Sequence, residues 1–292
     1  MRSLISFFAC LAVMFVSCKA NVSEVMQDLD LNSQLIGLEN AHNARQLGGY
    51  CIGDKVVRED VLIRTGKISA LSGADSALLS DKYKVQRIYD FRGMEEIVSE
   101  PDVIPANARH IPLSISFSSG ESQGSMKPGS KDDVIKLLLE NAGHPAVQNM
   151  CTGMYDMIFF EESSQQMYRK FFEDLVTADP KEGAVLWHCN QGKDRAGCAS
   201  AMLLAALGAD RTLIMADYSL SQDYYAPAVS RIPVQTEEQK AVINTLIGAN
   251  PAIFEAALDK MDAQYGSFDS YLEECIGVTE QMKRTLRERY LK

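Results

Sequence analysis

The chain has 292 residues, of which 46% are hydrophobic and 23% are charged, and this composition is typical of a folded globular protein with a substantial core. Its formal net charge of −10 lacks the excess of basic residues that a nucleic-acid-binding protein needs, so we expect no nucleic-acid partner. A small anionic substrate stays compatible with this charge, because a few arginines and local dipoles can outweigh the global sign.

The first residues are typical of a protein that is exported. An apolar run from Leu4 to Val16 follows an N-terminal arginine and is too short for a transmembrane helix. The run leads into Phe-Val-Ser-Cys, which resembles the lipobox of bacterial lipoproteins, where the cysteine carries the lipid. We therefore predict a signal peptide over residues 1–17, a lipid anchor at Cys18 and a tether over residues 18–39, with cleavage and secretion without lipid as the alternative. The expected location is the bacterial cell envelope, periplasmic or membrane-anchored, or outside the cell, and the anchor is the only membrane contact that we expect.

Residues 40–292 are predicted to form one α/β domain with a central, mainly parallel sheet flanked by helices, because strand and helix patterns alternate along them. Ser72 is expected to cap a helix with Asp75 in its first turn, and Gly208 to end another helix. The Ser/Gly-rich stretch 114–131 has no apolar period and is predicted to be a long loop, insertion or lid. The expected strands lie at 56–57, 61–63, 85–91 and 184–187, and the expected helices at 72–83, 132–142, 145–178 and 196–207, with mostly helix beyond.

A loop between a predicted strand and a predicted helix carries the chemistry. Backbone N–H groups of such a loop and the N-terminus of the helix point at one spot and form an anion site. The helix N-terminus and Arg195 also favour the thiolate form of Cys189, which can attack a phosphorus atom in line and form a cysteinyl-phosphate. Arg195 can hold two phosphate oxygens, most tightly in the transition state. The loop is His188-Cys189-Asn190-Gln191-Gly192-Lys193-Asp194-Arg195.

The other residues of this loop are predicted to surround the phosphate. Gly192 lets the backbone turn without a Cβ, and Gly197 lets the following helix approach closely. Lys193 adds a second cation beside the phosphate, with plain exposure to solvent as the alternative. The predicted phosphate-binding residues are Asn190, Gln191, Gly192, Lys193, Ala196 and Gly197.

The pattern Cys-x5-Arg is the signature of the protein tyrosine phosphatase superfamily. The string HCNQGKDRAG resembles the HCxxGKDRTG loop of the bacterial atypical, lipid- and protein-directed tyrosine phosphatases. Three further segments are similar to this family: NARQLGGY to its N-x-R-x-L-G-G, LIRTGKISALS to its R-S/T-G, and IYDFRGMEEIVSEPD to its D-L-R-x-x-x-E. The resemblance covers about residues 40–292. It implies a tyrosine phosphatase-like fold and hydrolysis of phosphotyrosine, and of phosphoserine or phosphothreonine if the enzyme has dual specificity, without a cofactor.

The general acid is expected within the same loop. The single tryptophan, Trp187, lies on the predicted strand, so the Trp-Pro-Asp loop of most tyrosine phosphatases is absent in recognisable form. The resemblance assigns the acid to Asp194, whose carboxyl group at the rim of the loop can protonate the leaving oxygen. Two alternatives stay open at this point: Asp194 only caps the helix, or Asp102, otherwise the residue of a surface turn, is the acid.

The remaining candidates are expected to support the site. His188 is expected to steady the loop through a hydrogen bond rather than to transfer a proton. Four further residues are expected to form buried or half-buried ion pairs under the pocket: Asp90, Arg92, Arg45 and Arg64.

Ala196 departs from the family pattern, which has threonine or serine after the loop arginine. That hydroxyl is thought to stabilise the departing thiolate when water cleaves the intermediate. Its loss is expected to slow the second step more than the first. Ala196 therefore keeps open a second class of function, a pseudo-phosphatase that binds phosphorylated partners without turnover.

Two substrate classes are consistent with the loop: phosphorylated proteins, and phosphoinositides or inositol phosphates, which Lys193 favours. A thiol-redox function of Cys189 with Cys198 is the weakest alternative, because Cys198 lies among small residues that usually only pack. We expect no metal, since the four histidines do not cluster with carboxylates at ligand spacing in the sequence.

Overall fold

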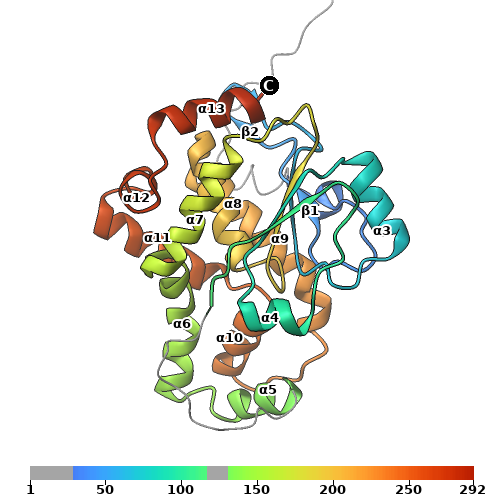
Figure 1. Ribbon diagram of the computed structural model, residues 1–292. Helices are drawn as coiled ribbons and strands as arrows, with labels where there is room; N and C mark the ends of the chain where they lie inside the picture. Colours follow the sequence, from blue (N-terminus) through green and yellow to red (C-terminus); the bar gives the residue numbers. More distant parts are fainter. Residues whose placement is uncertain (1–28, 117–130) are drawn as a thin grey trace, which may run out of the picture.

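The computed structural model describes residues 29–116 and 131–292 (Figure 1). The predicted signal peptide, Cys18 and most of the stretch 114–131 lie outside the described residues. The predicted tether extends too far, because its last residues belong to the domain. Helix α2 (Leu31–Gln34) is capped by Asp30, and Ile36 is buried in the core beyond it. An apolar side chain such as Ile36 gains more by joining this core than by staying in water.

A five-stranded sheet, in the order β1-β4-β7-β5-β6, lies at the centre of the part of the chain that the structure describes. Strands β4, β7, β5 and β6 run parallel, and β1 at one edge is antiparallel to β4. The predicted mainly parallel sheet is therefore confirmed. The strands are β1 (Arg45–Gln46), β4 (Leu62–Thr65), β5 (Arg87–Asp90), β6 (Arg109–Pro112) and β7 (Val185–His188), and β2 (Cys51–Ile52) and β3 (Lys55–Val56) form a separate hairpin.

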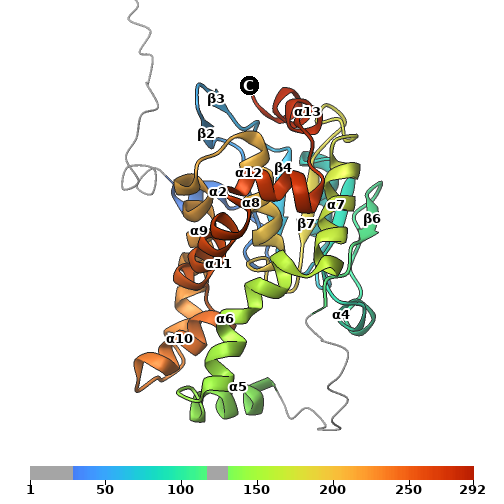
Figure 2. The same cartoon turned by 90° about the vertical axis from the view of Figure 1, so that its left-hand side faces the viewer.

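Helices flank the sheet, and α5, α6 and α10 gather at the end of the molecule away from the C-terminus (Figures 1 and 2). The predicted capping box of Ser72 and Asp75 is present at the start of α3. The helices are α3 (Gly73–Ala77), which continues as the π-helical turn η1 (Leu78–Lys82), α4 (Met94–Ser99), α5 (Lys131–Glu140), α6 (Pro145–Phe160), α7 (Glu162–Leu175), α8 (Arg195–Leu207), α9 (Arg211–Val229), α10 (Glu237–Leu246), α11 (Pro251–Tyr265), α12 (Phe268–Tyr271), η2 (Leu272–Ile276) and α13 (Glu280–Tyr290).

Each face of the sheet has its own core, because successive side chains of a strand point to opposite faces. Ile63, Leu186 and Ile88 are neighbours in register and pack with side chains of η1 on one face. Trp187 and Tyr89 are neighbours on the other face and pack against aromatic rings of α7. Burial on both faces explains why β7 is apolar without alternation up to its last residue.

The segment predicted as one helix over 145–178 is two helices, α6 and α7. Glu161 between them is extended, with φ −72° and ψ 130°, and side chains of α7 donate to carbonyl groups that the break leaves free. Phe159 at the end of α6 packs against rings of α11 and α12, whereas Phe171 on α7 packs against the sheet. The two apolar faces therefore serve different partners, and tertiary packing outweighs the helical pattern.

Among the described residues, no single helix is both long and apolar enough to cross a membrane. Helices α10 and α11 reach the required length and composition only as a pair, across a bend of 75°.

Candidate active site

Three parallel strands end together at the edge of the sheet where the cysteine loop begins. The register places Thr65 of β4 beside His188 of β7, and His188 beside Asp90 of β5. The carboxyl ends of parallel strands are where open α/β folds bind ligands. Cys189 follows His188 directly, and the chain then passes through the loop into α8, in the order that the sequence predicts.

The carbonyl groups of the loop are bound to donors on its outside. Gly192 O accepts a hydrogen bond from Arg64 Nη2 at 2.7 Å, and Gln191 O accepts one from the Tyr225 hydroxyl at 2.7 Å. In a trans peptide the N–H group points away from the preceding carbonyl group. The N–H groups that follow these carbonyls are therefore directed to the inside of the loop, where they can bind the oxygens of an anion.

Glycine is required at position 192. Its φ is +69°, and a Cβ there would lie 2.5 Å from the backbone nitrogen of Gly66. Cys189 is only 2% exposed at the base of the loop. The two residues that start α8 after the arginine, Ala196 and Gly197, are buried, and a Cβ on Gly197 would lie 3.1 Å from the Arg64 guanidinium. Close packing thus gives both glycines the roles expected from the sequence.

Arg195 is held by a carboxylate that the sequence reasoning did not assign. Its Nη1 and Nη2 atoms lie 2.6 and 3.0 Å from the two carboxylate oxygens of Glu96 on α4. Burial works to raise the pKa of Glu96, but the hydrogen bonds and charge of Arg195 outweigh it, and the pKa is lowered. This bidentate pair fixes the plane of the guanidinium beside the loop.

Asp194 does not cap the helix that it precedes. Its side chain accepts no hydrogen bond from the first turn of α8, although the residue occupies the N-cap position. Its Oδ1 atom instead accepts a hydrogen bond of 2.7 Å from the hydroxyl of Tyr155 on α6. The side chain is 14% exposed. The capping alternative therefore does not describe this carboxyl group.

Lys193 differs from both sequence-based expectations for its side chain. Its ammonium group is 1% exposed and donates to the carbonyl groups of Thr245 at 2.5 Å and Gly248 at 2.6 Å. Burial lowers its pKa. The same ammonium lies 3.7 Å from Oδ2 of Asp194. The charge thus fastens the loop to the end of α10 and the turn after it, and it is neither exposed to solvent nor free to bind a second phosphate.

The Asp217 cluster lies against the middle of the loop. It consists of Asp217 on α9, Arg45 and Arg64, all of them buried. Asp217 lies 3.4 Å from Arg45 and 2.5 Å from Arg64. Burial works to raise the pKa of Asp217, but the two arginine charges outweigh it and lower the pKa. Arg64 also holds Gly192 O, so this buried ion pair supports the loop directly.

The Asp90 cluster lies against the start of the loop and consists of Asp90, Arg92, Asp102, His110 and His188. Arg92 Nη2 lies 2.7 Å from Asp90 and 2.8 Å from Asp102. His110 Nε2 lies 3.4 Å from both carboxylates, and His188 Nε2 lies 3.0 Å from Asp102. Nδ1 of His188 faces the Cys189 carbonyl at 3.4 Å. His188 thus connects the cluster to the residue that carries the thiol.

This cluster bears on two sequence-based expectations. Sequence spacing indicated no cluster of histidines and carboxylates, but folding brings donor atoms of His110 and His188 within 4.8 Å of those of Asp90 and Asp102. Arg92 already gives both carboxylates a cation, so we assign the group to charge pairing. The side chain of Asp102 is buried rather than part of a surface turn. Burial works to raise its pKa, but the close contacts with both histidines and the charge of Arg92 outweigh burial and lower it, so the site does not favour Asp102 as the acid.

The sequence profile of the tyrosine phosphatase family matches residues 36–292. This chain belongs to the tyrosine phosphatase family. It is similar to a putative tyrosine-protein phosphatase of Cupriavidus necator, with 26% identity over 250 residues that cover 83% of this chain and 84% of the relative. It is also similar to the triple specificity protein phosphatase PtpB of Mycobacterium tuberculosis, with 24% identity over 262 residues that cover 79% of this chain and 91% of the relative. The solved catalytic core of Siw14 aligns over 78% of this chain and 95% of its own at 13% identity, and its TM-score of 0.31 is too low to add to the fold. The chain is a hydrolase of the protein phosphatase class.

A groove of about 640 Å³ opens beside the loop of this phosphatase. Asn190 and Gln191 form its wall on the side of the loop. Tyr224 and Arg231 line it from α9 and the segment after it, and Lys67 lines it from the segment after β4. The Lys67 ammonium is paired with Glu100, which also lines the groove. The groove therefore offers the ring of Tyr224 and the cation of Arg231 directly next to the candidate phosphate site.

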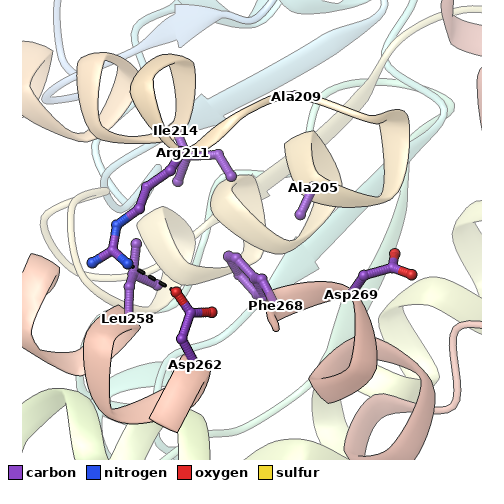
Figure 3. Close-up of a pocket in the computed structure, with 8 residues that line it drawn as sticks. All are labelled: Ala205, Ala209, Arg211, Ile214, Leu258, Asp262, Phe268 and Asp269. Atoms are coloured by element: carbon purple, nitrogen blue, oxygen red, sulfur yellow. Dashed lines mark hydrogen bonds and ion pairs between the residues drawn. The ribbon is translucent and has the colours of Figure 1, made fainter. Parts of the chain in front are cut away.

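A smaller hollow of about 210 Å³ lies at the far end of α8 and shares no lining residue with the loop (Figure 3). Arg211 extends into it and forms ion pairs with Asp262 at 3.0 Å and Asp259 at 2.6 Å. Its cation is thus already paired, and the hollow is not part of the phosphatase site.

Cys198 does not support a thiol-redox function. It is fully buried on α8, and burial raises the pKa of its thiol well above the ordinary value. A buried thiol of this kind is inert, whereas redox-active cysteines are accessible and favour the thiolate.

Sequence reasoning missed Glu96 and Tyr155, which contact the loop, and Asp217 and Tyr218, which reach it through Arg64 and Tyr155. Glu96 is the final residue of the segment DFRGMEE, so the family element D-L-R-x-x-x-E contained the signal that could have identified it. The other three lie on α6 and α9 within ordinary helical patterns. Nothing in their local sequence separates them from core residues.

Proposed function

We propose that this enzyme hydrolyses phosphotyrosine in proteins, with phosphoserine and phosphothreonine as further substrates, through a cysteinyl-phosphate on Cys189. The observation that carries the proposal is the junction between β7 and α8. There a buried cysteine begins a loop with outward carbonyls, Arg195 is oriented by Glu96, and Asp194 keeps a carboxyl group that caps no helix. These parts correspond to a nucleophile, an anion site and a proton donor.

In the first step the thiolate of Cys189 attacks the phosphorus, the S–P bond forms, and the P–O bond to the tyrosine breaks. Arg195 and the N–H groups of the loop bind the non-bridging oxygens and stabilise their charge in the transition state. Asp194 gives its proton to the leaving phenolate oxygen. The tyrosine thus leaves neutral, and Asp194 becomes a carboxylate.

In the second step water attacks the phosphorus of the intermediate. The carboxylate of Asp194 accepts a proton from this water, and the S–P bond breaks. Inorganic phosphate leaves and Cys189 returns to the thiolate. The two proton transfers balance, so Asp194 ends the cycle protonated as it began.

Within the family we place the chain in the branch with the HCxxGKDR loop, because residues 188–195 read HCNQGKDR. Phosphorylated proteins remain the leading substrate class. The groove beside the loop, lined by Tyr224 and Arg231, suits the residues that flank a phosphotyrosine. The alternative, a phosphoinositide or inositol phosphate, loses the support of Lys193, whose ammonium is bound to Thr245 and Gly248.

A panel of phosphotyrosine, phosphoserine and phosphothreonine peptides, together with a short-chain phosphoinositide, tests this proposal. We expect the highest kcat/KM on phosphotyrosine, no turnover by Cys189→Ser, and full turnover by the matched variant Cys198→Ser. Faster turnover of the phosphoinositide would replace the proposal by its alternative. Phosphopeptide binding by a wild type without turnover would identify a pseudo-phosphatase.

We also propose that the protein is exported and anchored by a lipid on Cys18. The support is the apolar run that ends at the lipobox-like string Phe-Val-Ser-Cys. In a bacterial host the full chain should be found in the membrane fraction and should carry lipid on Cys18. The variant Cys18→Ala should lose both properties, and its retention in the membrane would contradict the anchor.

A further inference from the structure

A chain of hydrogen bonds runs from a backbone amide to the candidate acid through two buried tyrosines. The amide of Asn250, in the turn between α10 and α11, lies 3.3 Å from the hydroxyl of Tyr218 on α9. The Tyr218 hydroxyl lies 2.5 Å from that of Tyr155 on α6. The Tyr155 hydroxyl lies 2.7 Å from Oδ1 of Asp194. The chain of hydrogen bonds thus connects the turn before α11, α9 and α6 to the carboxyl group of Asp194.

The direction of this chain is fixed at its two ends. A backbone amide can only donate, so the Tyr218 oxygen accepts from Asn250. Tyr155 has a single proton and donates it to Oδ1 of Asp194, so between the two hydroxyls Tyr218 is the donor. Burial raises the pKa of both tyrosines, so both hydroxyls keep the protons that they donate. Oδ1 is thus an acceptor in this arrangement, which leaves Oδ2, 3.7 Å from the Lys193 ammonium, to carry the acidic proton.

The tyrosine rings are held independently of their hydroxyl groups. Tyr218 stacks on Phe254 with ring centroids 4.1 Å apart and an angle of 2° between the planes. Tyr155 meets the same Phe254 edge to face at 5.2 Å. Removal of either hydroxyl therefore keeps the packing and removes only the hydrogen bond, so a phenylalanine variant reports on the hydrogen bond itself.

We propose that Tyr155 and Tyr218 are positioning residues that hold the carboxyl group of Asp194 with its Oδ2 proton directed to the leaving group. This inference rests on the proposed role of Asp194 as the acid. Lys193 binds the end of α10 and the same turn through Thr245 and Gly248. Lys193 is thus bonded directly to segment 245–250, and Asp194 is bonded to it through the two tyrosines. These bonds fix the position of Asp194 relative to Cys189.

The test compares aryl phosphates that differ in how much they need the acid. The phenolate that leaves from phenyl phosphate is strongly basic and needs a proton, whereas the less basic 4-nitrophenolate leaves without one. We expect Tyr155→Phe to lose about tenfold in kcat on phenyl phosphate, as for one hydrogen bond to a charged group, and much less on 4-nitrophenyl phosphate. Tyr218→Phe, one bond farther away, should show the same selectivity with a smaller loss.

Two control variants distinguish a positioning role from a general effect on folding or activity. Tyr271→Phe removes a buried hydroxyl that donates to the Phe159 carbonyl on α6, away from the loop, and should leave both substrates unchanged. Asp194→Asn should show the same selectivity as Tyr155→Phe, with a loss of about 10²-fold or more on phenyl phosphate. If Asp194→Asn is selective and the folded tyrosine variants are not, the positioning role is overturned and the acid stands. If Asp194→Asn is itself unselective, the acid assignment fails and the positioning role fails with it.

Discussion

The Asp217 cluster and the Asp90 cluster hold the same loop at two places, one through Gly192 O and the other through His188 and the Cys189 carbonyl. The side chains of Arg45 and Arg64 are fully buried, and that of Asp217 is 2% exposed. In the Asp90 cluster the side chain of His110 is 26% exposed. The first cluster thus has a charge that is fixed at any working pH, whereas the second contains a group that can exchange a proton with solvent.

The two clusters are therefore expected to stabilise the region around the loop in different ways. A buried ion pair costs desolvation energy, and the loss of one partner leaves the other charge buried alone. The Asp217 cluster is therefore expected to set the fold around the loop. The Asp90 cluster is expected to make the stability of the same region depend on pH.

The largest effect is expected in the buried cluster. Asp217→Ala leaves the guanidinium groups of Arg45 and Arg64 without their carboxylate, and we expect a loss of about 3–5 kcal/mol in the free energy of unfolding. The matched control is Asp262→Ala, which removes a half-exposed partner of Arg211 and should cost less than about 1 kcal/mol. Urea unfolding measures both. Equal losses in the two variants would contradict the account of the Asp217 cluster.

The second effect distinguishes the clusters by pH. Hydrogen bonds from His110 to Asp102 and Asp90 raise its pKa from 6.5 to about 9. The charge of His110 therefore stabilises the fold fully below about pH 6.5, and this contribution, about 2 kcal/mol after allowance for its partial exposure, is lost as the pH rises through 9. In His110→Gln the free energy of unfolding should change less over this range than in wild type. An unchanged pH dependence in the variant would remove His110 as the titrating group.

The smallest effect concerns the loop that both clusters hold. Ala196 stands where the family pattern has threonine or serine, so we expect wild type to release product in a burst followed by a slower steady rate. Ala196→Thr should raise the steady rate several-fold, and Ala196→Val, with the same shape and no hydroxyl, should not. Stopped-flow traces compare the three proteins. A single phase in wild type, with no gain in the threonine variant, would show that release is not limited by residue 196.

The elements around the loop could be predicted because their signals are local. The apolar run of β7, the small residues of α8 and the glycine at 192 lie within a few positions of Cys189. The capping box at Ser72 is likewise a pattern over four residues. Such signals predict the strand, the turn and the helix, and they therefore identify Cys189 as the candidate nucleophile and Arg195 as its arginine.

The partners of the loop other than Glu96 could not be predicted, because each lies far away in the sequence. Asp217 is 153 residues from Arg64, and Tyr155 is 39 residues from Asp194. Lys193 shows the same limit: its position in the loop suggested a phosphate ligand, whereas its contacts are carbonyl groups 52 and 55 residues away. These pairings depend on how helices pack on the sheet, and no local pattern encodes that.

Trapping the covalent intermediate shows whether Cys189 is the nucleophile. Wild type and Cys189→Ser are mixed with 4-nitrophenyl phosphate, quenched in denaturant during the first turnover, and analysed by intact mass and peptide mapping. We expect one phosphate per wild-type chain, located on the peptide with Cys189, and none on the variant. Nitrophenol release by wild type with no phosphate on Cys189, or with phosphate on another residue, would contradict this role of Cys189.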